Sequence, residues 1–222
     1  MNLLIKIDFK IDSFCASQAK KKNKLLRGFN RTVEPIYINQ VRDPVERIIS
    51  YYHYNRIYGS KTRAYRKIPA KKRLEKISED FIECFKKREE ECSYIMGNVQ
   101  QTQNGILSIP YFCGHENYCR VHGNVAALQK AKSVIETQYT VVGLLEEFNK
   151  TLVVLESFLP KYFRGIVNFY KKKAVKKNAI RRKQDFAEIK KKLKKNLTIE
   201  YELYGFIKQI LLNQYNFIMK NN

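Results

Sequence analysis

Residues 36–54 read IYINQVRDPVERIISYYHY, in which a β-type run gives way to a helical pattern within a few residues. The run from Ile36 to Val41 is rich in β-branched and aromatic residues, which predicts a buried strand. Pro44 suits the first turn of a helix because it has no backbone N–H, and Asp43 before it suits the N-cap. Apolar residues then follow at helical spacing: Val45, Ile48, Ile49 and Tyr52. The stretch therefore predicts a strand, a tight turn and a helix.

Two polar side chains of this stretch suggest an anion site. Arg42 stands at the carboxyl end of the predicted strand, and Ser50 lies two turns along the helix. In an open α/β sheet that edge is where ligands bind. A guanidinium offers a planar fork of donors to a phosphate, and a hydroxyl adds one more. The alternative is that Arg42 only pairs with Asp43 or Glu46, and the residue types leave both open.

The charge of the chain limits its partners. The 222 residues include 43 Lys and Arg against 21 Asp and Glu, a net charge of +22, and 44% are hydrophobic. This composition suits one domain with a sizeable core, and the charge favours polyanionic partners: nucleic acid, an anionic membrane or a sulfated glycan. The sequence has no apolar run of about 18 residues, so no membrane span is predicted. Residues 1–11 are too charged for a signal peptide.

Four of the five cysteines form two close pairs, Cys84 with Cys92 and Cys113 with Cys119. Neither pair has the C-x-x-C spacing typical of zinc sites, although a zinc site, two short disulfides and free buried thiols all stay open at this point. Three N-x-[ST] sequons fit a lumenal protein: Asn30, Asn149 and Asn196.

Strand and helix patterns alternate along the rest of the chain. Strands are predicted at 4–11 and 139–144, and helices at 76–87, 124–135, 146–158 and 199–219. Alternation of this kind implies parallel βαβ units and an α/β fold. The segments 19–31, 55–76 and 171–195 are strongly basic and are expected to be solvated loops.

A family resemblance rests on three blocks. R-D-P-x-x-R-x-x-S-Y-Y, from Arg42 to Tyr52, resembles the 3′-phosphate-binding motif of the Golgi heparan sulfate and uronyl 2-O-sulfotransferases. I-P-Y-F-C-G-H-E-N-Y-C, Ile109 to Cys119, is similar to a second block of that family. Val141 to Tyr170 is more similar to the uronyl than to the heparan sulfate enzymes. The resemblance implies a sulfotransferase domain over 36–222, truncated relative to the family, after a divergent segment over 1–35.

The resemblance implies a P-loop-like parallel sheet flanked by helices, and the cofactor 3′-phosphoadenosine-5′-phosphosulfate without a metal. Arg42 and Ser50 would hold the 3′-phosphate, and Tyr170 would stack on the adenine. Arg181 and Lys183 resemble the basic loop that closes over the 3′-phosphate. Substrate contacts are expected from Tyr51, Arg63 and Arg66. The resemblance also implies the disulfides Cys84–Cys92 and Cys113–Cys119, with Cys15 free.

The family pattern fails before residue 36. The family places a lysine-containing phosphate loop and a catalytic-base histidine upstream of the R-D-P strand. The three histidines of this chain, His53, His115 and His122, all follow the motif, and no such loop precedes it. No catalytic residue is therefore identified, and the first strand-and-loop unit is expected to be absent or replaced by residues 4–11. His115 lies within a cysteine pair and is expected to be structural.

The function implied by the resemblance is sulfate transfer to the 2-O position of a uronic acid in heparan or dermatan/chondroitin sulfate. The family further implies the Golgi lumen, association with the membrane and a homotrimer, although this chain shows no membrane anchor. Two other hypotheses stay open: an inactive remnant that binds nucleotide or glycan, and a nucleic-acid-binding protein. The cysteine pairs argue against the second, so no nucleic acid is expected.

Overall fold

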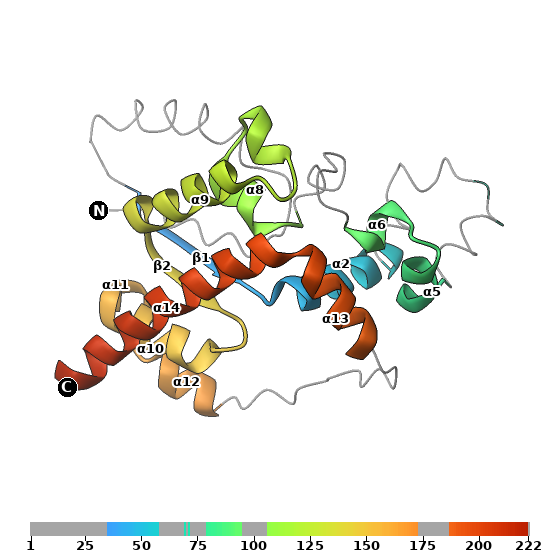
Figure 1. Cartoon of the computed structure of the whole chain (residues 1–222). Helices are drawn as coiled ribbons and strands as arrows, with labels where there is room; N and C mark the ends of the chain where they lie inside the picture. Colours follow the sequence, from blue (N-terminus) through green and yellow to red (C-terminus); the bar gives the residue numbers. More distant parts are fainter. Residues whose placement is uncertain are drawn as a thin grey trace.

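The computed structural model describes residues 35–57, 69, 71, 79–94, 106–172 and 187–221. Within these residues two strands and a series of helices follow one another (Figure 1). The elements are β1 (Tyr37–Val41), α2 (Pro44–Ile57), α5 (Phe81–Lys86), α6 (Glu90–Ser93), α8 (Ser108–Cys113), the 3₁₀ turn η2 (Asn117–Arg120), α9 (Val125–Gln138), β2 (Tyr139–Leu144), α10 (Phe148–Phe158), α11 (Pro160–Phe163), α12 (Ile166–Lys172), α13 (Ala187–Asn196) and α14 (Thr198–Asn221).

The two strands pair in parallel, with Val41 opposite Leu144 at their carboxyl ends. The Leu145 amide extends the ladder by donating to the Val41 carbonyl at 2.9 Å. The parallel pairing confirms the predicted α/β class. β1 is less buried than its composition predicts, because Val41 is its one fully buried residue. In the described part of the chain β1 has a neighbour, β2, along one edge only.

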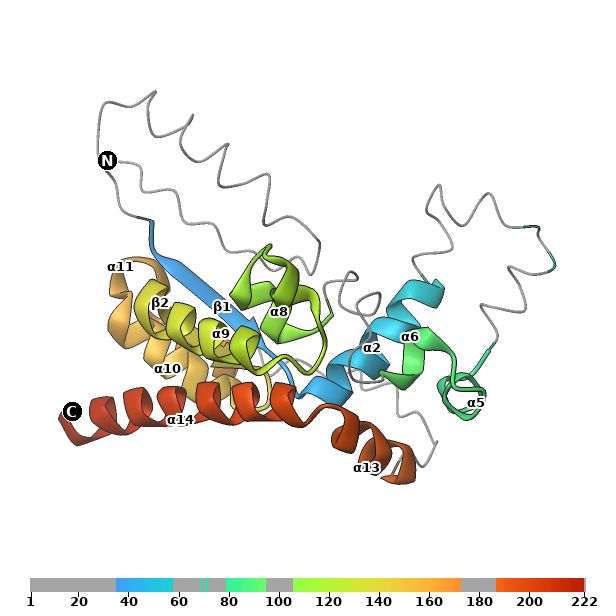
Figure 2. The ribbon, with the colours of Figure 1, turned by 45° about the horizontal axis from the view of Figure 1, so that its top comes forward.

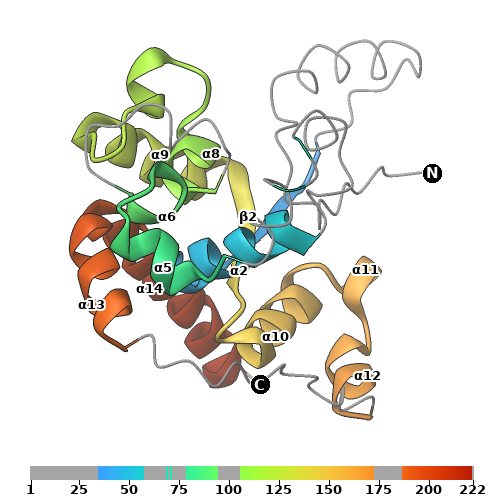
Figure 3. The same ribbon diagram turned by 90° about the vertical axis from the view of Figure 1, so that its right-hand side faces the viewer.

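Two clusters of buried apolar side chains hold the elements together. The first packs the sheet against α8, α9, α10 and α14, and includes Leu128, Val141, Leu144, Val154 and Ile207. The second joins α2, α5, α6 and α13, and includes the apolar stripe predicted for α2: Val45, Ile48, Ile49 and Tyr52. Figures 1 and 2 show these groups at opposite ends of the molecule, with α14 running along the sheet. In Figure 3, α9 and α10 lie on opposite sides of β2.

Several element boundaries follow the sequence pattern, and two do not. β2 spans the predicted residues 139–144, and α9 begins after Asn124, whose side chain accepts a hydrogen bond from the Ala127 amide at 3.0 Å. The helix predicted from 146 begins at Phe148 instead, because Glu146 is engaged elsewhere, as described below. Glu79 and Asp80 are not helical, although the pattern of residues 76–87 predicted a helix there, and α5 begins at Phe81.

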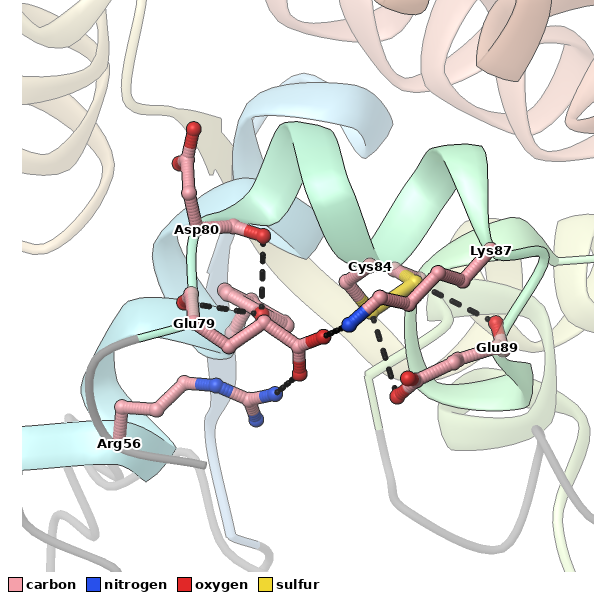
Figure 4. The surroundings of a disulfide bond; sticks show 8 residues. Arg56, Glu79, Asp80, Cys84, Lys87 and Glu89 are labelled. Atoms are coloured by element: carbon pink, nitrogen blue, oxygen red, sulfur yellow. Dashed lines mark hydrogen bonds and ion pairs between the residues drawn. A yellow bond between two sulfur atoms is a disulfide. The ribbon is translucent and has the colours of Figure 1, made fainter. Parts of the chain in front are cut away.

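Both expected disulfides, Cys84–Cys92 and Cys113–Cys119, are present. Figure 4 shows the surroundings of the first, where the Glu79 carboxylate lies between Arg56 at 3.4 Å and Lys87 at 2.7 Å. The Tyr52 hydroxyl donates to the carbonyl of Glu79 at 3.2 Å. These contacts attach the disulfide loop to the second half of α2.

A close approach inside the first cluster fixes α10 against β2. The Thr151 hydroxyl accepts a hydrogen bond from the Leu144 amide at 3.0 Å and lies 3.3 Å from the Leu144 carbonyl, to which it donates. A Cβ atom added to Gly143 would overlap the Thr151 methyl group and would lie 3.0 Å from its hydroxyl oxygen. Thr151 cannot rotate away without losing its hydrogen bonds to the strand, so this position requires glycine.

We expect Gly143→Ala to lower the free energy of unfolding by about 1–3 kcal/mol, the usual cost of overpacking a core. Gly205→Ala is the matched control, because Gly205 lies within α14 and nothing comes within 4 Å of an added Cβ. That substitution should stabilise the protein by about 0.5–1 kcal/mol. Urea denaturation of both variants checks the prediction, and equal effects of the two substitutions would contradict it.

Candidate functional site

Arg42 lies where the turn leaves β1, and its local geometry follows from the next four residues. The Asp43 side chain accepts a hydrogen bond from the Glu46 amide at 3.0 Å, so Asp43 is the predicted N-cap of α2. Arg42 Nη2 lies 3.3 Å from Glu46 Oε2, and the Arg42 side chain is 34% exposed. One of the two partners considered for Arg42 is thus present. The pair is partly exposed, and ion pairs of this kind are weak, so an anion can compete with Glu46 for the guanidinium.

Ser50 is exposed on α2, four residues after Glu46 and eight after Arg42. Glu46 and Ser50 are four residues apart and share one side of α2, whereas Arg42 precedes the helix and meets that side through its contact with Glu46. Tyr51 is half-buried and packs against the second core cluster. Arg42 and Ser50 are therefore on one surface, whereas part of Tyr51 serves the core.

The carboxyl ends of the two strands are joined by side chains of α14. Tyr201 donates its hydroxyl proton to the Asp43 carboxylate, with oxygen separations of 2.9 and 3.0 Å. Tyr204 donates to Glu146 Oε2 at 3.0 Å, and Glu146 Oε1 accepts from the Asp43 amide at the same distance. Burial and the neighbouring carboxylates raise the pKa of both tyrosines, which keeps them as neutral donors. Glu146 therefore links the two strand ends.

Tyr170, on α12, reaches the same edge through Phe148. The two rings meet edge to face with centroids 5.0 Å apart. Phe148 is the first residue of α10 and follows Glu146 by two positions, so it stands just beyond the carboxyl end of β2. Tyr170 thus packs against the first residue of α10, the helix that follows β2.

The second arginine of the motif, Arg47, points into the protein and was not among the predicted site residues. Its Nη1 donates to the Ser108 hydroxyl at 3.1 Å. Glu200, which is 2% exposed, accepts from the amides of Ser108 at 2.9 Å and Ile109 at 3.0 Å, at the start of α8. Burial raises the pKa of Glu200 to about 7, while these two hydrogen bonds and the charge of Arg47 act in the opposite direction. Burial likewise lowers the pKa of Arg47.

This group ties α2, α8 and α14 together below the candidate site. A sequence signal for it exists, because Glu200 falls on the buried stripe of α14 with Leu203, Ile207 and Leu211. A carboxylate on an apolar stripe must find donors in the interior, since an unpaired buried charge is costly. The cation near the Glu200 carboxylate is the motif residue Arg47, which follows Arg42 by five positions.

The sequence model of the sulfotransferase family matches residues 2–207. The uronyl 2-sulfotransferase homolog pip of Drosophila melanogaster is 37% identical over 197 residues, which cover 82% of this chain and 37% of that protein. Heparan sulfate 2-O-sulfotransferase 1 of Xenopus laevis is 33% identical over 189 residues, covering 83% and 48%. Human uronyl 2-sulfotransferase is 32% identical over 184 residues, covering 79% and 43%.

The chain belongs to the sulfotransferase family. It spans less than half the length of the three relatives just named. The family match includes the segment before residue 36 as well as the strand–turn–helix unit. No helix among the described residues is long and apolar enough to cross a membrane.

Two of the three described histidines, His122 and His115, differ in their surroundings. His122 is 3% exposed, its Nε2 lies 3.0 Å from the Asn196 carbonyl, and burial lowers its pKa. His115 is exposed within the Cys113–Cys119 loop, and the structural role expected for it stays a prediction. The described residues contain no group of three His, Cys, Asp or Glu side chains able to hold a metal ion.

Several predicted residues lie outside the described part of the chain: Cys15, Asn30, Arg63, Arg66, Arg181, Lys183 and the strand at 4–11. Of the other two sequons, Asn149 is exposed on α10. The Asn196 amide nitrogen donates to the Ser93 carbonyl at 3.1 Å. All three sequons stay predictions.

The buried Glu200 carboxyl predicts a specific pH dependence. Its pKa of about 7 in the folded protein is above the ordinary value of 4.5, so the native state binds this proton more tightly than the unfolded chain does. The stabilisation is complete below the unfolded pKa and is lost as the pH rises through the folded one. In Glu200→Gln an amide NH₂ meets a backbone N–H, which should cost about 1–3 kcal/mol at pH 5. The difference in the free energy of unfolding between wild type and Glu200→Gln should become smaller towards pH 8.

The measurement is urea denaturation of wild type and Glu200→Gln at pH 5, 6.5 and 8. Glu202→Gln is the matched control, because Glu202 is 54% exposed and pairs with Lys132 at the surface. It should change stability by about 0.5 kcal/mol or less, since surface ion pairs contribute little. A difference between wild type and Glu200→Gln that widens with rising pH would rule out the proton-binding role of Glu200.

Proposed function

We propose that the protein transfers sulfate from 3′-phosphoadenosine-5′-phosphosulfate to the 2-O position of a uronic acid in a glycosaminoglycan. The proposed acceptor class is heparan or dermatan/chondroitin sulfate, and the similarity to uronyl and heparan sulfate 2-O-sulfotransferases supports a uronic acid of such a glycan. The observation that carries the proposal is the placement of Arg42 at the carboxyl end of β1, on one surface with Ser50. The proposed sulfotransferase domain is 36–222.

The residues present fit a 3′-phosphorylated adenine nucleotide. The Arg42 side chain is 34% exposed, and Ser50 is exposed on α2 one turn beyond Glu46, which suits a phosphate that needs several donors. Tyr170 offers an aromatic ring at the same edge for the adenine. When bound, the nucleotide supplies the sulfuryl group that is transferred. Arg181 and Lys183 remain proposed contacts to the 3′-phosphate.

The proposed acceptor matches the charge of the chain. A net charge of +22 favours a polyanion, and a sulfated glycan satisfies it without base-specific contacts. Tyr51, Arg63 and Arg66 are the proposed glycan contacts. Two disulfides support an oxidising compartment, for which we propose the Golgi lumen with membrane association and a homotrimeric assembly.

A second candidate function is binding of the nucleotide and glycan without transfer. The observation that favours it is the distribution of histidines, none of which precedes Arg42 in this chain. The base that removes the acceptor proton is thus not identified among its residues.

The test is transfer of radiolabelled sulfate to desulfated heparan sulfate and dermatan sulfate. We expect transfer by the wild type, with kcat/KM reduced about 100-fold in Arg42→Ala through loss of a charge-assisted contact to the phosphate. Arg164→Ala is the matched control, because Arg164 is exposed in the turn before α12. It should keep its activity.

The acceptor that is labelled identifies the substrate class. Absence of transfer, together with nucleotide binding that Arg42→Ala abolishes, would support the second candidate. Transfer that Arg42→Ala does not affect would refute the site proposed here.

A further inference from the structure

The Glu46 carboxylate is shared by two cations from distant parts of the chain. Arg42 Nη2 lies 3.3 Å from Glu46 Oε2, and Lys190 Nζ lies 2.6 Å from Glu46 Oε1. Lys190 comes from α13, which packs against α2 in the second core cluster through Leu193. Each oxygen of one carboxylate thus takes one cation, so Arg42 and Lys190 are held on either side of a single anionic group.

The position of the Glu46 carboxylate within the candidate site suggests a role in ligand binding. Glu46 pairs with Arg42, which precedes α2, and Ser50 follows Glu46 by one turn on the same side of the helix. It therefore occupies the place between the two residues proposed to hold the 3′-phosphate. A phosphate group presents several oxygens to cationic donors, as a carboxylate does, and it carries more negative charge.

We propose that Lys190 is a further binding residue for the 3′-phosphate, and that Glu46 competes with this phosphate for Arg42 and Lys190. The inference rests on the nucleotide site of the proposed function. In the protein without nucleotide the Glu46 side chain pairs with both cations. A 3′-phosphate takes over both partners when the nucleotide binds, and the Glu46 side chain turns towards solvent.

The surroundings of Glu46 allow this exchange. The side chains of Arg42, Glu46 and Lys190 are 34%, 36% and 43% exposed, so water can replace each contact as it breaks. The Glu46 amide is bonded to the Asp43 side chain, which fixes the backbone and leaves only the side chain to move. Ion pairs this exposed are weak, whereas contacts of two cations with one phosphate reinforce each other.

The exchange also predicts selectivity among nucleotides. A nucleotide that lacks the 3′-phosphate has no group to replace Glu46, so it leaves the carboxylate paired with both cations. Lys190 and Glu46 should therefore affect the binding of adenosine 3′,5′-bisphosphate and leave that of adenosine 5′-phosphate unchanged. A purely structural role of either residue would alter the binding of both nucleotides alike.

The experiment is calorimetric measurement of Kd for these two nucleotides with the full chain and its variants, each checked for folding by circular dichroism. Lys190→Ala should weaken bisphosphate binding about tenfold and change monophosphate binding less than about twofold. Lys191→Ala removes the same charge from the exposed side of α13 and should change both values less than about twofold. Glu46→Gln should strengthen bisphosphate binding about threefold or more, because the competing charge is gone.

The outcomes separate this inference from the proposed function. If wild type binds both nucleotides equally, or binds neither, the nucleotide site itself fails and the inference with it. If Arg42→Ala abolishes the preference for the bisphosphate but Lys190→Ala behaves like Lys191→Ala, the nucleotide site stands and the role of Lys190 is refuted. Weaker bisphosphate binding by Glu46→Gln would refute the competition. Lys190→Arg should retain the preference, since it restores the charge.

Discussion

The parallel pairing of β1 with β2 places the carboxyl ends of both strands side by side, and the candidate site depends on that arrangement. Because Val41 pairs with Leu144, the residues that follow each strand meet at one edge. Glu146 exploits this proximity by accepting the Asp43 amide proton and the Tyr204 hydroxyl proton. The start of α2 is thereby fixed with respect to β2 and α14, and Arg42 is placed by three elements at once.

Charged side chains are buried near this edge, at a place where apolar side chains could have packed instead. Arg47, Ser108 and Glu200 form a buried polar group, in which both carboxylate oxygens of Glu200 accept backbone amide protons at the start of α8. Such groups contribute little to net stability, because the desolvation of the charges offsets their attraction. Their directional hydrogen bonds fix the relative positions of α2, α8 and α14 more narrowly than apolar contacts would. We attribute the placement of α2, and hence of Arg42 and Ser50, partly to this group.

Local sequence patterns predicted the strand–turn–helix unit because each of its signals is short-range. The β-branched run before Arg42, the Asp43 cap, Pro44 and the apolar stripe of α2 all act within a few residues of one another. The two disulfides were predicted from the family resemblance, because the spacing of the cysteines alone was also compatible with a zinc site or with free thiols. The partners of Glu146 and Glu200, and Lys190 as the second partner of Glu46, could not be predicted, because each lies on an element distant in the sequence. A glutamate at a helix start gives no sign of which lysine or tyrosine will reach it.

The local charge at the candidate site differs in character from the charge of the whole chain. Although the net charge is +22, the carboxyl edge of the sheet gathers four acidic side chains: Asp43, Glu46, Glu146 and Glu147. Each already has a donor in the structure, and the Lys150 ammonium holds the pKa of Glu147 below its usual range.

An anion that arrives at this edge therefore meets cations that are paired. In the proposed exchange, Arg42 and Lys190 become available to this anion as their ion pairs with Glu46 break, so one anion replaces another. Such an exchange favours ligands that carry more negative charge and more acceptor oxygens than a carboxylate. It weakens the binding of polyanions that have no phosphate in the right position. The excess of lysine and arginine elsewhere on the chain can then attract a sulfated glycan without that glycan occupying the nucleotide site. In the proposed function, the acidic residues of this edge thus keep the nucleotide and the sulfated glycan at separate places on one basic protein.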